Sequence, residues 1–313
     1  MSHRILVTGA SGFIGQALTA KLAKANWAVN VAVRRSGKPS EFVVGNIDAQ
    51  TKWAGALQGC RTVVHLAARV HVMRDEAVDP LAEFRKVNVE GTLNLARQAA
   101  EAGVRRFIFL STIKVNGESS KPGRPFLPDD VPAPEDAYGI SKLEAERGLQ
   151  QLCAESGMEL VVIRPPLVYG PGVGGNFRAM VHWVRRGIPL PLGAIDNRRS
   201  LVALDNLVDL IEVCLTHPAA ANQVFLAADG EEVSTTELLL RIAHAWGGKA
   251  RLLPVPPTWL RCGAAMLGKA GAADRLLGSL EVDSTKARDL LDWRPVVSMS
   301  EQLGKMTRDD SRS

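Results

Sequence analysis

Apolar runs and amphipathic stretches alternate along the first half of the chain. The segments between the apolar runs have the three-to-four-residue apolar spacing of helices, as in Phe13 to Leu22, and the longest helix is expected from about Asp79 to Gly103. Strands that alternate with helices form a parallel sheet covered on both faces. The pattern predicts an α/β, doubly wound parallel sheet. Its expected strands are 4–8, 29–34, 61–66, 106–111 and 159–164.

Beyond Arg164 the pattern loosens, because prolines and glycines interrupt short apolar stretches. We therefore divide the chain into a first domain over residues 1–166 and a smaller C-terminal domain over residues 167–313. Some segments of the second part are expected to return to the first. A loop with five prolines, from Lys121 to Pro134, leads into the helix that carries Tyr138.

The charge of the chain favours small phosphorylated ligands over nucleic acid. The formal net charge is +5, from 38 basic and 33 acidic residues. The basic pairs are short and scattered, whereas a nucleic-acid surface needs them clustered with aromatic residues. Its four cysteines are far apart and form no Cys-x-x-Cys pair, so we expect reduced, structural thiols and a cytoplasmic protein.

Histidine and tryptophan positions suggest structural roles. His65, His71, His182 and His244 lack the spacing of a metal site, so no metal is expected, and His65 is interpreted as a structural residue in a buried strand. Trp183, Trp246 and Trp259 fall in apolar helical stretches, which predicts core packing. The segment from Trp259 to Leu280 fits a lid helix, with a membrane-surface helix as the alternative.

Three glycines follow the first predicted strand. Gly9, Gly12 and Gly15 allow a tight turn and the close approach of a pyrophosphate to the N-terminus of the next helix, where free N–H groups favour anions. The alternative is a tight strand–helix turn without a ligand.

Tyr138 and Lys142 are four residues apart, so on a helix they lie on one face. A tyrosine with an ordinary pKa of about 10 is a poor base at neutral pH, and a fixed cation nearby lowers that value. Bringing the pKa near 7 takes about 4 kcal/mol, which a lysine together with the positive ring of an oxidised nicotinamide could supply.

Together these residues resemble the extended short-chain dehydrogenase/reductase superfamily, the branch of nucleotide-sugar epimerases, dehydratases and reductases. The resemblance extends over nearly the whole chain and predicts a Rossmann-type first domain with a nucleotide-sugar lid domain behind it. Beyond the glycine turn and the Tyr138–Lys142 pair, the matching segments are 64–68, 88–92, 107–112, 164–172, 199–205, 283–287 and 293–295.

The resemblance implies a catalytic set of Thr112, Tyr138 and Lys142, with Ser111 as the neighbouring candidate for Thr112. A strand-end threonine that caps backbone is the structural alternative. The implied cofactor site consists of Gly9, Ser11, Gly12, Phe13, Ile14, Gly15, Arg34, Asn46, Ile47, Leu66, Ala67, Ala68, Asn88, Tyr138, Lys142 and Pro165.

Arg34 decides between the two nicotinamide cofactors. It ends the second strand where members that use NAD usually carry an acidic residue, and a guanidinium there suits the 2′-phosphate of NADP. We therefore expect NADP(H), with NAD(H) as the alternative; an exposed basic strand end without this role is also possible.

On the substrate side the resemblance implies a UDP-sugar held by Thr112, Asn176, Arg199 and Arg275. Asn176 is expected to precede a helix from Met180 to Arg186, and surface arginines are the alternative for Arg199 and Arg275. Leu167 replaces an asparagine that the family often carries, which leaves the sugar open. The expected partners are this substrate and a second copy of the chain, in a homodimer, with neither nucleic acid nor a membrane.

Three functions fit these residues. Dehydratases of the superfamily carry an acidic pair where this chain has Ile113 and Lys114, so dehydration is not expected. Segments 65–73 and 111–118 look most like those of bacterial C4-reductases, and this resemblance implies reduction of a UDP-4-keto-6-deoxy-N-acetylhexosamine for surface polysaccharide. The alternatives are a UDP-hexose 4-epimerase with tightly bound NAD and a non-catalytic dinucleotide sensor.

Overall fold

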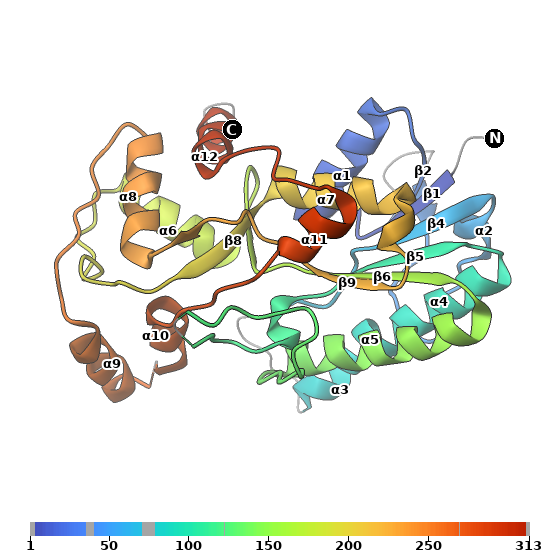
Figure 1. The fold of residues 1–313 in the computed structure, drawn as a ribbon, viewed down its shortest axis with the longest axis horizontal. Coiled ribbons are helices and arrows are strands. Elements are labelled where there is room, and N and C mark those ends of the chain that lie inside the picture. The colour runs from blue at the N-terminus through green and yellow to red at the C-terminus, as the bar shows by residue number, and fades with distance from the viewer. Residues whose placement is uncertain (1–3, 36–40, 71–78, 122, 269, 311–313) are drawn as a thin grey trace.

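A computed structural model describes residues 4–35, 41–70, 79–121, 123–268 and 270–310. The larger lobe is built on a seven-stranded sheet (Figure 1), in which all neighbouring strands are parallel. Its spatial order is β3 (Glu41–Val43), β2 (Ala28–Val33), β1 (Arg4–Thr8), β4 (Cys60–His65), β5 (Arg106–Leu110), β6 (Glu159–Arg164) and β9 (Gln223–Leu226). The predicted α/β, Rossmann-type fold is confirmed.

Strand order reverses between β1 and β4, because the chain runs outward from β1 to β3 and then returns to the other side of β1. In open α/β sheets, ligands bind at such a switch point, beyond the carboxyl ends of the strands. The two residues that follow these ends here are Gly9 and Leu66.

Helices cover both faces of the main sheet (Figure 1). On one face lie α2 (Ala54–Leu57), α3 (Pro80–Arg85), α4 (Thr92–Glu101) and α5 (Ala137–Ser156); on the other lie α1 (Phe13–Lys24), α7 (Leu204–Thr216) and α11 (Thr285–Leu291). The single helix expected from Asp79 to Gly103 is wrong in one respect: a π-helical segment, η1 (Lys86–Gly91), separates α3 from α4.

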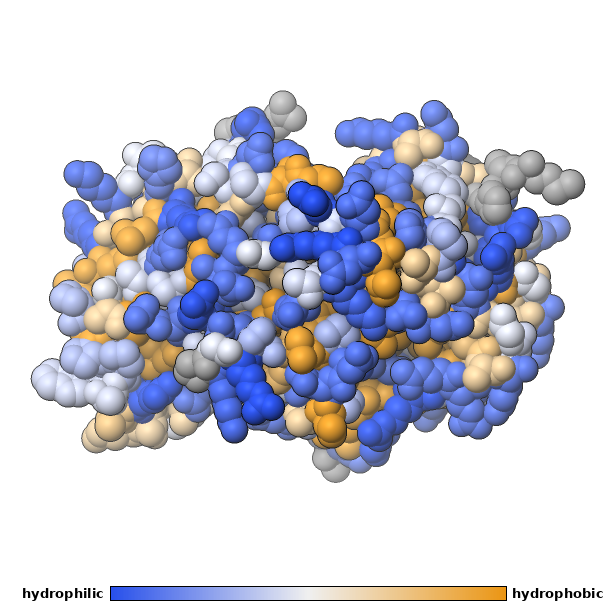
Figure 2. Space-filling model, in the orientation of Figure 1, coloured by the Kyte–Doolittle hydropathy of each residue, from blue (hydrophilic) through white to orange (hydrophobic). Residues whose placement is uncertain are grey.

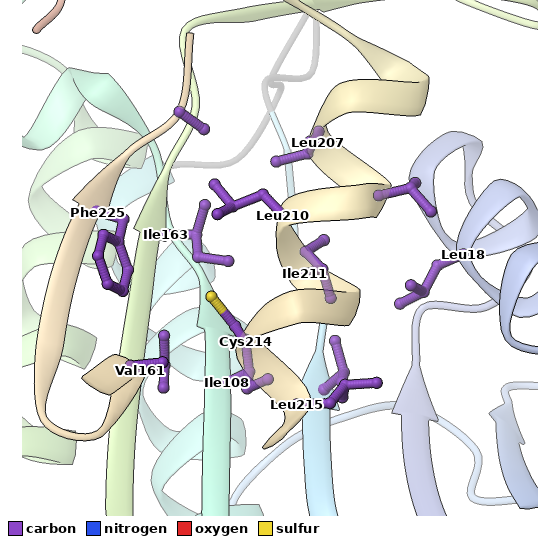
Figure 3. Close-up of a cluster of buried hydrophobic side chains, with 14 of the residues drawn as sticks. Leu18, Ile108, Val161, Ile163, Leu207, Leu210, Ile211, Cys214, Leu215 and Phe225 are labelled. Atoms are coloured by element: carbon purple, nitrogen blue, oxygen red, sulfur yellow. The ribbon is translucent and has the colours of Figure 1, made fainter. Parts of the chain in front are cut away.

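Alternate strand residues enter two different cores, as a sheet covered on both faces requires. Ile5 and Val7 pack in the core beneath α1 and α7, while Leu6 packs in the core beneath α4 and α5. Figure 3 shows Leu210 and Cys214 of α7 facing Ile163 of β6. Since α7 comes from the second half of the sequence, the first core is shared by both halves of the chain.

The smaller lobe surrounds a three-stranded sheet of β7 (Leu167–Tyr169), β8 (Arg199–Ala203) and β10 (Glu232–Val233). The expected helix from Met180 to Arg186 is longer, α6 (Gly175–Arg185), so Asn176 lies in its first turn and does not precede it. The remaining helices are α8 (Thr235–Ala245), α9 (Pro257–Met266), α10 (Ala270–Leu277) and α12 (Met299–Asp310).

Two of the three tryptophans expected in the core lie at the surface. Trp183 on α6 is 37% exposed and Trp259 on α9 is 72% exposed, whereas Trp246 packs against the core of the smaller lobe. On the face shown in Figure 2, hydrophilic residues predominate and apolar ones are scattered among them. Among the described residues, no helix has the length and apolarity needed to cross a membrane.

Candidate functional site

The glycine turn and the loop after β4 touch at the switch point of the sheet. Gly9 has φ +68°, and a Cβ on it would lie 2.7 Å from the backbone nitrogen of Ala67. A Cβ on Gly15 would lie 2.2 Å from the carbonyl oxygen of Gly9. Both positions therefore require glycine, because the backbones of β1, α1 and the β4 loop approach too closely for a side chain.

The N-terminus of α1 is open toward this turn. Gly12 is its N-cap residue, and no side chain caps the helix or places a negative charge in the first turn. Ser11 is exposed, while Phe13 and Ile14 are partly buried. Unpaired N–H groups at such a helix end favour a phosphate.

His65, at the end of β4, is within hydrogen-bond distance of two buried threonines. Its Nδ1 lies 2.7 Å from Thr8 Oγ1 and its Nε2 lies 3.0 Å from Thr92 Oγ1. Burial, and then the charge of Lys142, lower the pKa of His65 to about 3, so the imidazole is neutral at physiological pH. This is a structural role, as the sequence suggested. His71 lies outside the described residues.

Arg34, Asn46 and Ile47 line the side of the site where the sequence predicts the adenosine half of the cofactor. Arg34 is exposed directly after β2. Ile47 packs against η1, where a Cβ on Gly91 would lie 2.6 Å from its side chain. The backbone oxygen of Asn46 accepts a hydrogen bond from Thr51 Oγ1 at 2.8 Å. Of these three residues, Ile47 is the one that the structure places against η1.

Asn88 is fully buried, and its hydrogen bonds connect two segments of the chain. Its side chain accepts a hydrogen bond from Arg69 N and donates to Arg69 O and to Ser141 Oγ. It thereby ties the loop after β4, which carries Ala67 and Ala68, to α5. Asn88 shapes the predicted cofactor site through its neighbours' backbone.

Lys142 places a buried cation beneath the site. The side chain is 1% exposed, and its Nζ lies 3.8 Å from the centroid of the Phe109 ring. Among the described residues no hydrogen-bond partner of this ammonium group is found, and burial lowers the pKa of Lys142 to about 7. A buried ammonium without hydrogen-bond partners fits a site that receives polar groups from a ligand.

Tyr138 is the second residue of α5, after an N-cap at Asp136 whose carboxylate accepts a hydrogen bond from Gly139 N at 2.7 Å. Burial, and then the negative charge of Asp136, raise the pKa of Tyr138 to about 12. The sequence predicted a lowered pKa from Lys142 together with the positive ring of a bound nicotinamide. In the protein alone, burial and the Asp136 carboxylate raise the pKa instead. The lowered value stays a prediction for the complex with the cofactor.

Thr112 and Ser111 have different surroundings at the end of β5. Ser111 Oγ donates a hydrogen bond to the buried Glu146 carboxylate. Thr112 Oγ1 accepts from Lys114 N at 3.3 Å, which leaves its hydroxyl proton available to a ligand. The geometry therefore favours Thr112 over Ser111 for contact with a substrate oxygen. The cap that Thr112 makes is also the structural role weighed from the sequence.

Glu146 and Arg164 form a buried ion pair that the sequence analysis did not identify. Arg164 Nη2 lies 2.5 Å from Glu146 Oε2, and the two side chains are 5% and 1% exposed. Arg164 also donates to Asn116 Oδ1 at 3.0 Å. Glu146 lies one turn beyond Lys142 on the same face of α5, and a charged residue on that buried face was the available signal.

Two of the predicted substrate residues meet in the smaller lobe. Arg199 Nη1 donates to the backbone oxygens of Arg275 and Gly278, at 2.6 and 3.0 Å, and burial lowers the pKa of Arg199. Arg275 itself is exposed and donates to Gly271 O. Asn176 is exposed on α6. Leu167, at the start of β7, is 40% exposed.

The larger and smaller lobes approach each other beside the glycine turn. A Cβ on Gly172, in the loop after β7, would lie 3.9 Å from the ring of Phe13. Pro165 follows β6, and its carbonyl accepts a hydrogen bond from Ile113 N. Among the described residues, no group of three or more His, Cys, Asp or Glu side chains could hold a metal ion.

The residues present fit a dinucleotide. The glycine turn has no room for a Cβ, the helix behind it lacks a side-chain cap, and the Lys142 ammonium is buried without a hydrogen-bond partner among the described residues. These three features lie at or beside the carboxyl ends of β1, β4 and β5. They provide N–H donors for phosphates and a cation for hydroxyl groups.

The chain is similar over nearly its whole length to known proteins. The chain is 47% identical over 306 residues to a UDP-glucose 4-epimerase of Vibrio cholerae, covering 96% of this chain and 93% of that protein. A structure of UDP-glucose 4-epimerase from Thermotoga maritima with UDP-glucose has a TM-score of 0.76 and 25% identity, with 99% of each chain covered. The structure of RMD from Pseudomonas aeruginosa complexed with NADPH has a TM-score of 0.76, 23% identity and coverage of 98% of this chain and 99% of that one.

The model of the NAD dependent epimerase/dehydratase family matches residues 5–228, which include the glycine turn, Thr112, Tyr138, Lys142 and Arg199. The resemblance to the extended short-chain dehydrogenase/reductase superfamily is thereby confirmed. The chain belongs to the NAD dependent epimerase/dehydratase family.

Proposed function

We propose that the protein interconverts the C4 epimers of a UDP-hexose. The observation that carries this proposal is the 47% identity to the Vibrio cholerae UDP-glucose 4-epimerase, which extends over nearly the full length of both chains. The sequence alone favoured a reductase. The comparison favours the epimerase, because the similarity covers 96% of this chain and so extends over both lobes.

Tyr138 removes the proton from the C4 hydroxyl and later returns it. Thr112 donates a hydrogen bond to the C4 oxygen, and the Lys142 ammonium binds ribose hydroxyls while its charge favours the phenolate. A nicotinamide dinucleotide, when bound, supplies hydride acceptance and return at C4. The dinucleotide is bound by the glycine turn, Arg34, Asn46, Ile47, residues 66–68 and Pro165. Asn88 supports this site through its hydrogen bonds to Arg69 and Ser141.

The diphosphate of the substrate is bound by Asn176, Arg199 and Arg275. Arg199 uses one guanidinium nitrogen to hold the backbone after α10, which leaves its other nitrogen for a phosphate oxygen. Its burial strengthens a charge-assisted bond to an anion. The exposed Arg275 and Asn176 are free to approach from the α10 and α6 sides.

Arg34 supports a second candidate, a reductase of a UDP-4-keto-6-deoxy-N-acetylhexosamine that exchanges NADPH. No acidic residue follows β2 before Arg35, and the Arg34 side chain is exposed. A guanidinium there forms charge-assisted bonds to a 2′-phosphate. On this account NADPH binds at least tenfold more tightly than NADH, a difference of about 1.4 kcal/mol.

Two incubations separate the candidates. The purified protein is given UDP-glucose with no added cofactor, and UDP-galactose is measured. In parallel, it is given UDP-4-keto-6-deoxy-N-acetylglucosamine with NADPH, and nicotinamide absorbance is followed. Epimer formation without net change in nicotinamide supports the proposal. Consumption of NADPH matched by a 6-deoxy-4-hydroxy sugar, with no epimer formed in the first incubation, would establish the reductase.

A further inference from the structure

Two short turns meet at the start of α5, one carrying Thr112 and the other Tyr138. The first is η2 (Ile113–Val115), which follows Thr112 directly. Lys114 N donates to Thr112 Oγ1, and a Cβ on Gly139 would lie 3.0 Å from the carbonyl oxygen of Lys114. The backbone of Lys114 thus lies between the two catalytic residues, in contact with both turns.

The side chain of Lys114 makes a second connection. Its Nζ lies 2.5 Å from Asp136 Oδ2 and 2.7 Å from Glu118 Oε1. The other oxygen of Asp136 caps α5 by accepting from Gly139 N. One carboxylate therefore joins Lys114 to the helix end at which Tyr138 is held, and all three charged side chains are about three-quarters buried, at 22–27% exposed.

We propose that Lys114 is a positioning residue for the Tyr138 reaction, which fixes the start of α5 against the Thr112 turn and offsets the charge of Asp136 beside the phenol. This inference rests on the proposed role of Tyr138 in proton transfer. The Lys114 ammonium donates to Asp136 and Glu118, and its backbone N–H donates to Thr112 Oγ1, so these contacts serve the two turns and involve no substrate atom.

Charge gives this role a measurable consequence. Burial is the largest cause of the raised pKa of Tyr138, and the negative charge of the Asp136 carboxylate is the second. Burial opposes ionisation of Asp136 as well, yet hydrogen bonds from Lys114 and Gly139 lower its pKa overall. Removing Lys114 leaves the carboxylate uncompensated and should raise the pKa of Tyr138 further, whereas removing the charge of Asp136 should lower it.

Other charged groups around the start of α5 remain unchanged in the test. Arg69 lies over the Phe84 ring, which in turn lies 6.0 Å from the Tyr138 ring. Lys142 lies on α5, and Glu118 lies in the loop after η2. The Arg85–Glu144 pair joins α3 to α5, and Arg69 lies in the loop after β4.

The experiment compares Lys114→Met, Lys114→Arg, Asp136→Asn and the Lys114→Met/Asp136→Asn double variant. Asparagine keeps the cap of α5 without its charge. The first readout is the acid limb of kcat/KM for epimerisation. We expect Lys114→Met to move it to higher pH by about one unit and Asp136→Asn to move it lower, with the double variant near the wild type. Lys114→Arg should retain the wild-type profile.

The second readout needs no substrate. The chain has two tyrosines, Tyr138 and Tyr169, and burial followed by the nearby Asp229 carboxylate raises the pKa of Tyr169 far above its ordinary value. Tyrosinate absorbance of the protein with oxidised cofactor therefore reports Tyr138 first, with Tyr138→Phe as the blank. Asp136→Asn should titrate at lower pH than the wild type.

A variant Lys114→Met that loses turnover with an unshifted pH profile would overturn the proposal and leave Lys114 a purely structural residue. An Asp136→Asn protein whose tyrosinate titration matches the wild type would overturn it too. If the wild type epimerises no UDP-hexose, the proposed function fails. The tyrosinate titration of Lys114→Met then still decides the role of Lys114: it should shift to higher pH than the wild type, and an unshifted titration would overturn the proposal.

Discussion

Tyr138 and Lys142 lie one turn apart on α5, and burial moves their pKa values in opposite directions, to about 12 and about 7. Each shift disfavours the charged form, as expected for groups taken out of water. On the proposed function, an oxidised cofactor bound here would place positive charge near the phenol and hydroxyl groups near the ammonium. Both would favour the ionised forms of Tyr138 and Lys142.

Replacing Tyr138 by phenylalanine should reduce turnover by a factor of roughly 10² or more, because general acid–base transfer at C4 is lost. Cofactor affinity should stay near the wild-type value, since the ring and the fold of α5 remain. Steady-state kinetics and a fluorescence titration of the cofactor measure the two effects. Lys142→Ala, in contrast, should weaken both. Wild-type turnover in Tyr138→Phe would remove the proposed acid–base group.

His65 predicts an acid-sensitive stability. Between pH 6.5 and about 3 the unfolded chain binds a proton at this residue that the folded chain does not, so the free energy of unfolding falls as pH falls through that window. The limiting slope is about 1.4 kcal/mol per pH unit. Urea unfolding of wild type and His65→Gln at several pH values tests this, with His182→Gln on the exposed face of α6 as the matched control. An equal slope in His65→Gln would contradict it.

Among single residues, the sequence pointed to Tyr138 and Lys142 through their spacing and to Thr112 through the family resemblance, and their catalytic roles stay predictions. It did not locate Glu146 or the Lys114–Asp136 pair. Their roles depend on contacts between α5 and the ends of β5 and β6, which no local pattern encodes.

At the scale of elements, five strands of the main sheet lie within about one residue of their predicted bounds, because each is a short apolar run. Two strands escaped prediction. β3 has three residues, and β9 lies in the half of the chain where the pattern had loosened. The π-helical segment also escaped. Its residues Asn88 and Gly91 lie against Ser141 and Ile47, which are distant in the sequence, so no local pattern marks it.

Two glycine-to-alanine changes distinguish the β1–α1 turn from an ordinary helix. Gly15→Ala should destabilise the protein and abolish cofactor binding, because its Cβ would lie 2.2 Å from Gly9 O. Gly263→Ala on α9 meets nothing within 4 Å and should stabilise the protein by up to about 1 kcal/mol. Thermal unfolding and cofactor titration of both variants make the comparison. Normal cofactor affinity in Gly15→Ala would contradict the close approach seen in the structure.

At the scale of the whole molecule, the two halves of the sequence share a core. Residues from both halves of the sequence pack together around α7, with Leu18 on one side and Val161 and Phe225 on the other (Figure 3). Lys21 on α1 also pairs with Asp209 on α7 at 2.7 Å. The boundary at residue 166 therefore separates parts that do not bury their apolar surface independently.

This shared core predicts one cooperative unfolding transition for the full chain. A fragment of residues 1–166 lacks α7 and β9, leaves the apolar face beneath them exposed, and should fail to form a soluble folded monomer. Calorimetry of the full chain and size-exclusion chromatography of the fragment test these expectations. Two resolved transitions, or a monomeric fragment with a native-like circular dichroism spectrum, would contradict them.

The central claim is that the hydrogen at C4 of a UDP-hexose leaves and returns within one site. UDP-glucose carrying deuterium at C4 tests it directly, with mass spectrometry of the UDP-galactose formed in ordinary water. We predict product that keeps its deuterium, because Tyr138 exchanges the hydroxyl proton with solvent while the C4 hydrogen is never released to water. Product that has lost the deuterium, or no product at all, would contradict the account.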